Sequence, residues 1–262
     1  MRSSTALLLI GLLLYGPACQ KEEGTHLRNR ILKAIINITE IDDGNPSSYE
    51  YTFDYIYKNT LVSEILLDEQ KHIELSNEVD KLIAKRYFNN AVTYARLDSF
   101  IYDSKDALQF IKGYNQSNKN IWEAEIISNN DILSGYKLDI YYPDPISEET
   151  TYNFDGQNIL QAFQGTNLEY NYQYSDINNY QDLNFFFNNS DMVNQVGLHA
   201  WTLPIVYSKN FIESVKGYFN GEQSFQIDYE HFVENGLYVG FKTMWYDDEG
   251  ELAKTAQIEF LY

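Results

Sequence analysis

Several stretches of this chain alternate polar and bulky apolar residues with a period of two. Residues 49–54 (YEYTFD) and 169–174 (EYNYQY) show the pattern most clearly. Successive side chains of a β-strand point to opposite faces, so this pattern predicts strands with one buried face and one face in water. The strands expected elsewhere on the same grounds are residues 122–127, 136–142, 225–229, 237–245 and 256–261.

Short units rich in Asp, Asn and Gly follow many of the predicted strands. Asp and Asn accept hydrogen bonds from backbone amides two residues further on, and Gly adopts positive φ at little cost, so these units predict hairpin turns. The units are Phe53-Asp54, Tyr102-Asp103, Phe154-Asp155-Gly156, Tyr246-Asp247 and the weaker Asn235-Gly236. No regular alternation of strand and helix occurs, so a parallel sheet is not expected.

We therefore predict an all-β fold, an antiparallel β-meander of repeated hairpins that is twisted and curled into a partial barrel, with the strand count and closure left open. One segment resists this interpretation. Residues 77–88 (NEVDKLIAKRYF) place Val79, Leu82, Ile83 and Tyr87 at helical spacing, which predicts one short helix, with a pair of strands as the alternative. No linker rich in Pro, Gly or Ser divides residues 29–262, so a single β-meander domain is expected there.

The amino terminus is typical of an exported protein. Arg2 precedes an apolar run over residues 6–14, which is shorter than the roughly 20 residues that span a bilayer and fits a signal peptide over residues 1–18. Cys19 follows small residues and is the single cysteine of the chain, so it has no internal disulfide partner. This arrangement resembles a bacterial lipoprotein signal and implies lipidation of Cys19, although Gly16 stands where such signals usually carry Leu.

Residues 19–28 are interpreted as the lipidated cysteine and a tether. Gln20, Lys21, Glu22 and Glu23 resemble the surface-export signal of Bacteroidetes lipoproteins. That resemblance implies a protein anchored in the outer membrane by its lipid and facing the medium. An ordinary polar tether and a periplasm-facing position stay open as alternatives.

A wider resemblance covers most of residues 49–262. The aromatic-Asp-turn-Leu units are similar to YD-type repeats, and together with the lipoprotein start and residues 207–210 (YSKN) they resemble a Bacteroidetes lipoprotein family that carries a β-rich domain of unknown function. The longer turn between Phe53 and Leu61 and the segment 77–88 depart from this pattern, which leaves the strand register open. The resemblance implies no activity.

Composition and motifs exclude several function classes. The formal net charge of −19 disfavours binding to the phosphate backbone of nucleic acids. The sequence has no Gly-x-Ser-x-Gly elbow, phosphate loop or dinucleotide fingerprint, and its four histidines show no zinc-binding spacing. We therefore expect no enzyme activity, no catalytic residue, no cofactor and no metal site.

Acidic residues offer two further candidates. Three acid pairs could serve glycoside hydrolysis, but 38 acids make such pairs common by chance. Residues 42–45 and 247–251 gather hard oxygens without the spacing of a twelve-residue calcium loop, so turn chemistry is the simpler interpretation. The acid pairs are Glu123 with Glu125, Glu148 with Glu149, and Asp247 with Asp248.

Three tryptophans could stack on sugar rings or could fill the core face of the sheet. Trp201 lies in a less regular stretch and is the candidate for ligand contact, whereas Trp122 and Trp245 lie in predicted strands. The preferred function is a surface-exposed, non-catalytic binding or structural module for a glycan or protein partner. The alternatives are an extracellular glycan hydrolase and a periplasmic carrier of lipids or lipoproteins.

Overall fold

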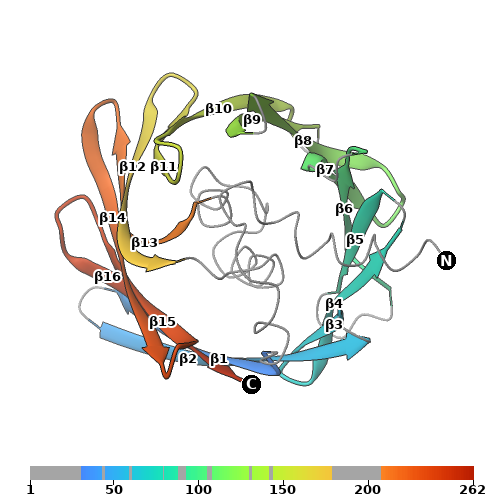
Figure 1. The fold of residues 1–262 in the computed structure, drawn as a ribbon, viewed down its shortest axis with the longest axis horizontal. Helices are drawn as coiled ribbons and strands as arrows, with labels where there is room; N and C mark the ends of the chain where they lie inside the picture. Colours follow the sequence, from blue (N-terminus) through green and yellow to red (C-terminus); the bar gives the residue numbers. More distant parts are fainter. Residues whose placement is uncertain are drawn as a thin grey trace.

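The computed structural model describes residues 31–42, 45–58, 61–78, 80–87, 93–104, 108–129, 132–141, 144–178 and 208–262. Within these ranges the chain forms sixteen β-strands that close into one barrel (Figure 1). Every strand is antiparallel to its neighbours, and the order around the wall follows the order in the sequence. The predicted all-β antiparallel meander is confirmed.

Most consecutive strands are separated by ten residues or fewer in the sequence, and β12 and β13 are separated by many more. Their bounds are β1 Lys33–Asp42, β2 Asn45–Lys58, β3 Leu61–Leu67, β4 Gln70–Asn77, β5 Lys81–Arg86, β6 Arg96–Tyr102, β7 Leu108–Asn115, β8 Asn120–Asn129, β9 Ile132–Ile140, β10 Ile146–Phe154, β11 Ile159–Gln164, β12 Leu168–Asn178, β13 Asn210–Phe219, β14 Glu222–Glu234, β15 Leu237–Tyr246 and β16 Leu252–Leu261.

The barrel is fully closed, which exceeds the partial curl expected from the sequence. β1 pairs with β2 on one side and with β16 on the other, in a register that runs from Lys33 opposite Leu261 to Glu40 opposite Lys254. Both terminal strands have ten residues, so their ladders match in length. Closure removes the exposed strand edges that an open sheet would present to other chains.

The helix expected over residues 77–88 is absent, and the alternative pair of strands is correct. β4 ends at Asn77, a tight turn carries a hydrogen bond from the Glu78 amide to the Lys81 carbonyl, and β5 follows. Burial alternates along β5, with Leu82 and Ala84 buried. A period of two therefore holds over the described part of this segment; Val79 and Phe88 lie outside the described residues.

The acidic turn units behave largely as expected. The Asp155 carboxylate accepts the amides of Gln157 and Asn158 at 2.7 Å each, between β10 and β11. Asp247 acts in the same way between β15 and β16, and Asn235 takes a φ of 52° in the turn between β14 and β15. One unit differs in part: the predicted hairpin forms between β2 and β3, but Phe53 and Asp54 lie inside β2, which continues to Lys58.

Candidate functional site

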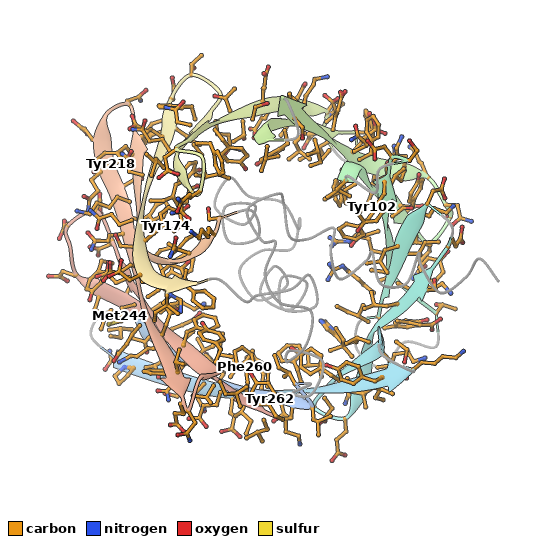
Figure 2. All side chains as sticks on the ribbon, viewed as in Figure 1. Tyr102, Tyr174, Tyr218, Met244, Phe260 and Tyr262 are labelled. Atoms are coloured by element: carbon orange, nitrogen blue, oxygen red, sulfur yellow. The ribbon has the colours of Figure 1, made fainter. Side chains whose placement is uncertain are left out.

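The inner wall, defined as the side chains that point into the barrel, is apolar. Phe260 of β16 lies on the inner side of the wall in Figure 2, whereas Tyr218 lies on the outer side. Ala34 is the partner of Phe260 on β1, and it is buried together with Ile36. The same buried face continues around the barrel through Tyr55, Ile65, Ile73, Leu82, Phe100, Ile111, Ala124, Leu138, Tyr152, Ala162, Tyr172, Val215, Ile227 and Phe241.

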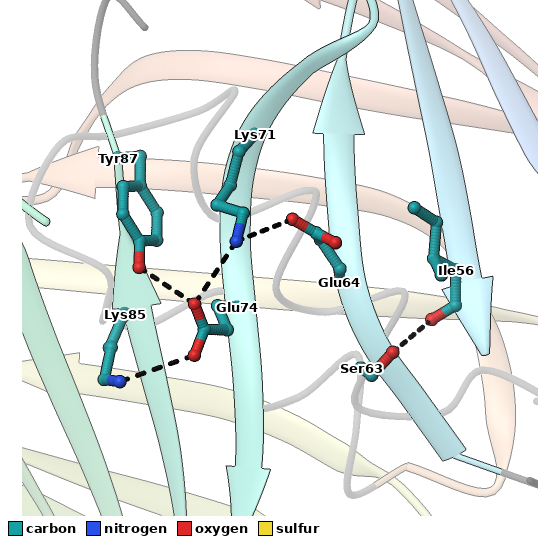
Figure 3. Close-up of polar contacts among 7 residues, drawn as sticks. All are labelled: Ile56, Ser63, Glu64, Lys71, Glu74, Lys85 and Tyr87. Atoms are coloured by element: carbon teal, nitrogen blue, oxygen red, sulfur yellow. Dashed lines mark hydrogen bonds and ion pairs between the residues drawn. The ribbon is translucent and has the colours of Figure 1, made fainter. Parts of the chain in front are cut away.

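The outer wall, by contrast, carries networks of charge. Lys71 Nζ lies 2.9 Å from Glu64 Oε1 and 3.4 Å from Glu74 Oε2, while Lys85 Nζ lies 3.4 Å from Glu74 Oε1 (Figure 3). The Tyr87 hydroxyl donates to Glu74 at 2.9 Å. This hydrogen bond and the two lysines lower the pKa of Glu74, so the carboxylate stays ionised.

This distribution of polarity is the reverse of that in a transmembrane barrel. Membrane barrels present an apolar band outward and a polar lumen inward, and a lysine on the lipid face costs about 2–4 kcal/mol at the bilayer midplane. Here the outer wall is stable in water and costly in lipid. The outer wall has three further ion pairs. Two join neighbouring strands and one lies within β9: Lys33–Asp54, Lys112–Glu123 and Lys137–Asp139.

A charged group interrupts the apolar inner wall at one end of the barrel. Arg86 ends β5, Arg96 begins β6, and Asp98 follows two residues later, so all three face inward at one end of the barrel. Asp98 Oδ2 accepts from Arg86 Nε at 2.6 Å and from Arg96 Nη2 at 3.0 Å. Asp98 Oδ1 lies 3.0 Å from Arg96 Nε. We call these three residues the arginine cluster.

The arginine cluster is deeply buried. The side chains of Arg86 and Asp98 are 3% and 2% exposed, and that of Arg96 is 12% exposed. Burying charges costs several kcal/mol per ion, which close pairing and hydrogen bonds must offset. Directly across the strand ladder from Asp98 is Ala84, whose small side chain leaves room for the guanidinium groups.

Trp122 extends this cluster along the wall. Gly113 on β7 lies opposite Asp98 on one side and opposite Trp122 of β8 on the other. The indole lies over Gly113, because a Cβ built there would come within 1.9 Å of Trp122 Nε1. Trp122 is 4% exposed, and its indole N–H finds no hydrogen-bond acceptor among the described residues. The wall thus holds a buried, unused donor next to the arginine cluster.

A second polar group on the inner wall consists of tyrosines and amides. Gln164 Nε2 donates to Glu148 Oε2 at 2.6 Å, and the Tyr170 hydroxyl donates to Gln164 Oε1 at 3.2 Å. Burial raises the pKa of Tyr170 and, in the same part of the wall, that of Tyr136 to about 12. These hydroxyls stay protonated at neutral pH and can serve as hydrogen-bond donors.

His231 lies in an aromatic stack on the inner wall. Its ring centroid is 4.6 Å from that of Phe211, and Phe211 in turn stacks on Tyr238 at 4.4 Å. Nδ1 of His231 is 2.8 Å from the Tyr238 hydroxyl and Nε2 is 2.7 Å from the Ile212 carbonyl. Burial lowers the pKa of His231, so the ring is neutral, with Nε2 donating to the carbonyl. Both nitrogens are used within the fold, which is the pattern of a structural histidine.

The acid pairs named as candidates for hydrolysis lie at different places in the wall. Glu123 lies on the outer wall, 2.7 Å from Lys112. Glu148 faces inward, whereas its neighbour Glu149 faces outward, because they are consecutive in β10. Asp247 binds the amides of its own turn. Glu123 is thus paired with a lysine, Glu148 and Glu149 point to opposite faces of the sheet, and Asp247 is used by its own turn.

Several predicted site residues cannot be compared with the structure. The residues expected to carry the lipid, the export signal and the ligand contact lie outside the described ranges: Cys19, Gln20, Lys21, Glu22, Glu23 and Trp201. Trp122 is buried and Trp245 partly buried on the inner wall, which confirms the core-filling interpretation for these two.

Within the described ranges no group of three or more His, Cys, Asp or Glu residues could hold a metal ion. In the same ranges no helix is long and apolar enough to cross a membrane.

The arginine cluster was not among the residues predicted from the sequence. A signal was present, since Arg86 shares the strand face of Leu82 and Ala84, and Asp98 shares that of Phe100. Charged residues at buried positions of two adjacent strands are informative. The helical interpretation of residues 77–88 hid that relation.

Comparison with known proteins adds likenesses in fold only. No protein-family model matches the chain. No curated protein matches it either. Among solved structures, a porin-like protein from Bacteroides vulgatus aligns with a TM-score of 0.49 at 9% identity, over 86% of this chain and 97% of that one. A porin-like protein from Bacteroides uniformis gives 0.42 at 10% identity, over 89% and 98%.

A third solved structure, a DUF1329 family protein from Desulfovibrio piger, aligns with a TM-score of 0.25 at 6% identity, over 89% of this chain and 85% of that one. All three scores are below 0.5. No property of these proteins is therefore transferred to this chain.

Proposed function

We propose that this protein is a non-catalytic binding barrel that takes up an amphipathic molecule and holds its apolar part against the inner wall. The observation that carries the proposal is the division between a largely apolar inner wall and a charged outer wall. A sixteen-stranded barrel is wider than its own side chains can fill, and an apolar lining of that size favours apolar ligands. The proposal adopts the carrier alternative in place of a glycan or protein partner bound on an exposed face.

The proposed location is the outer membrane, with the barrel in water and a lipid on Cys19 as the anchor. Several acyl chains at about 0.8 kcal/mol per buried methylene would hold such a protein stably. A charged outer wall agrees with a barrel that stands beside the bilayer. Mass spectrometry of the mature amino terminus tests the anchor, and proteolysis of intact cells tests exposure to the medium. An unmodified Cys19, or its absence from the mature protein, would contradict the anchor.

Uptake of an apolar ligand is tested with a neutral fluorescent probe. The full chain carrying Cys19→Ser, which cannot be lipidated, is titrated with N-phenyl-1-naphthylamine, whose emission rises in apolar surroundings. We expect saturable binding that dodecanol displaces. The heat-unfolded chain serves as a blank for nonspecific adsorption.

Two matched variants locate the probe. Leu138→Ala removes a buried side chain of the inner wall, and Ile127→Ala removes an exposed apolar side chain from the outer wall of the adjacent strand. Each variant is checked for folding by circular dichroism. Inner-wall binding predicts that Leu138→Ala changes the affinity and Ile127→Ala does not. The reverse result, or no saturable binding in the parent chain, would refute the proposed function.

A further inference from the structure

We propose that the side chains of Tyr136, Thr150 and Glu148 form a hydrogen-bonding site on the inner wall for a hydroxyl group of the ligand. The ligand is then an uncharged amphiphile, such as a long-chain alcohol or a glycerol ester, and not a fatty acid. This inference rests on the proposed function, because it assigns the headgroup of the ligand whose apolar part lies along the same wall. The juxtaposition that carries it is a pair of buried hydroxyls on neighbouring strands with a carboxylate beside them.

The first step is the register, which puts these side chains on one face. Tyr136 of β9 lies directly opposite Thr150 of β10, and the two strands pair without a register shift. Glu148 lies two residues before Thr150 in β10, so it points to the same, inner face. Gln164 of β11 lies opposite Thr150 on its other side. Four polar side chains from three strands are therefore adjacent on the inner wall.

The second step is the pair of unused hydroxyls. Tyr136 is 1% exposed and Thr150 is 0% exposed, and neither hydroxyl has a hydrogen-bond partner among the described residues. Burial raises the pKa of Tyr136, and Thr150 lies close enough to oppose part of that rise. A hydrogen bond between the two hydroxyls would use one O–H and leave the other O–H without an acceptor. Buried polar groups nearly always have a partner, so we expect a group from outside the described wall here.

The third step is the acceptor. Glu148 Oε2 accepts from Gln164 Nε2 at 2.6 Å, which holds the carboxylate against the inner wall. Its negative charge adds to the burial that raises the pKa of Tyr136 and of Tyr170, so the carboxylate lies near both phenols. A ligand hydroxyl at this place can accept from Tyr136 and donate to Thr150 or Glu148, since a hydroxyl does both. A ligand carboxylate would have no proton to donate and would meet the like charge of Glu148.

The fourth step is the apolar surface next to the site. Ile126 of β8 lies opposite Tyr136 on the side away from Thr150, and Leu138 follows Tyr136 on the same face of β9. Both of these aliphatic side chains are buried. A ligand whose hydroxyl lies at Tyr136 would therefore place its chain on Ile126 and Leu138. This is the part of the wall that Leu138→Ala alters.

The test compares two isomers that differ in their ability to donate a hydrogen bond. Dodecanol and methyl undecyl ether have the same atomic composition, but only the alcohol has an O–H. Both compete with N-phenyl-1-naphthylamine on the full chain carrying Cys19→Ser, with dodecanoate as the charged probe. We expect dodecanol to bind about 10-fold more tightly than the ether, as one additional hydrogen bond would give, and dodecanoate to bind more weakly than dodecanol. Equal binding of the alcohol and the ether, or tighter binding of dodecanoate, would overturn the inference and leave the proposed function standing.

Variants assign the preference to named residues. Tyr136→Phe and Thr150→Val each remove one hydroxyl and keep the shape of the side chain, and both should reduce the preference for the alcohol. Without ligand, neither should lower the urea midpoint, because no described partner is lost. The matched control is Tyr174→Phe, since the Tyr174 hydroxyl lies 2.6 Å from the Ile159 carbonyl and 2.8 Å from Ser208 Oγ. This control should lower the urea midpoint and keep the preference.

Folding of each variant is checked by circular dichroism before titration. If one of the two site variants unfolds, the other decides the outcome. A folded site variant that keeps the full preference for the alcohol would overturn the inference, since a water molecule would then suffice to satisfy the hydroxyls. A urea midpoint lowered as far as in Tyr174→Phe would also overturn it, because the hydroxyl would then be used within the fold. Failure of all three probes to displace the dye from the parent chain would refute the proposed function instead.

Discussion

Replacing Gly113 with alanine should destabilise the barrel by about 1–3 kcal/mol, the usual cost of overpacking a well-packed core. The new Cβ would lie 1.9 Å from Trp122 Nε1 and 2.4 Å from Cε2. Non-bonded heavy atoms pack at about 3.5–4.0 Å, so the indole would have to move by roughly 1.5–2 Å. Trp122 is a rigid ring buried in the wall, so it cannot swing into solvent as a flexible side chain would.

Urea denaturation followed by circular dichroism measures this loss. The clash predicts coupling: Gly113→Ala should cost much less in a Trp122→Leu background than in the parent chain. A matched control comes from Gly217, where a Cβ would lie 2.2 Å from Phe225 Cε1. Gly217→Ala should be equally destabilising and should not respond to Trp122→Leu. A Gly113→Ala chain within about 0.5 kcal/mol of the parent, or showing no coupling to Trp122, would refute the reasoning.

Three further outcomes follow from buried polar groups. Asp98→Ala removes the carboxylate paired with Arg86, and the free energy of unfolding measured by urea denaturation should fall by about 3–5 kcal/mol. A decrease of less than about 1 kcal/mol would contradict the importance of the buried pair. Burial lowers the pKa of His231, so the unfolded chain binds more protons than the folded chain. The contribution of His231 to stability should therefore be full above about pH 6.5 and decrease as the pH falls below that value. The assignment would be contradicted if the melting temperature of the parent chain did not fall at low pH, or if the His231→Gln variant showed the same fall. Burial raises the pKa of Tyr136 to about 12 and raises that of Tyr229 as well. The folded state should therefore lose stability as the pH rises from about 10 towards 12. An absorbance titration in which all tyrosines ionise near pH 10 while the chain stays folded would contradict this.

Much of the wall could be predicted from the sequence, because period-two alternation is a local property. Residues 49–54 and 169–174 have their aromatic side chains on the inner face, as the pattern indicates. The segment 77–88 shows where the pattern is ambiguous. Leu82 and Ile83 are adjacent apolar residues that fit a helix face, yet in the strand Ile83 faces outward on the opposite side from Leu82.

Closure and the candidate site depend on contacts that local patterns do not encode. The barrel closes because residues near Lys33 pair with residues near Leu261, more than two hundred positions away in the sequence. The row from Asp98 through Gly113 to Trp122 likewise requires the register of three strands. The sequence left open whether the tryptophans form an exposed platform or fill the core; the register places Trp122 and Trp245 on the inner face.

The most direct test of an apolar inner wall and a water-facing outer wall is labelling of adjacent cysteine variants in outer-membrane vesicles. Glu123→Cys places a thiol on the outer wall and Ala124→Cys places one on the inner wall of the same strand, where Ala124 is fully buried. A membrane-impermeant maleimide, read out by mass spectrometry of the labelled peptide, should modify position 123 rapidly with or without detergent and position 124 only after unfolding. Protection of position 123 until detergent is added, with rapid modification of position 124, would mean that the barrel spans the bilayer and would contradict the proposed arrangement.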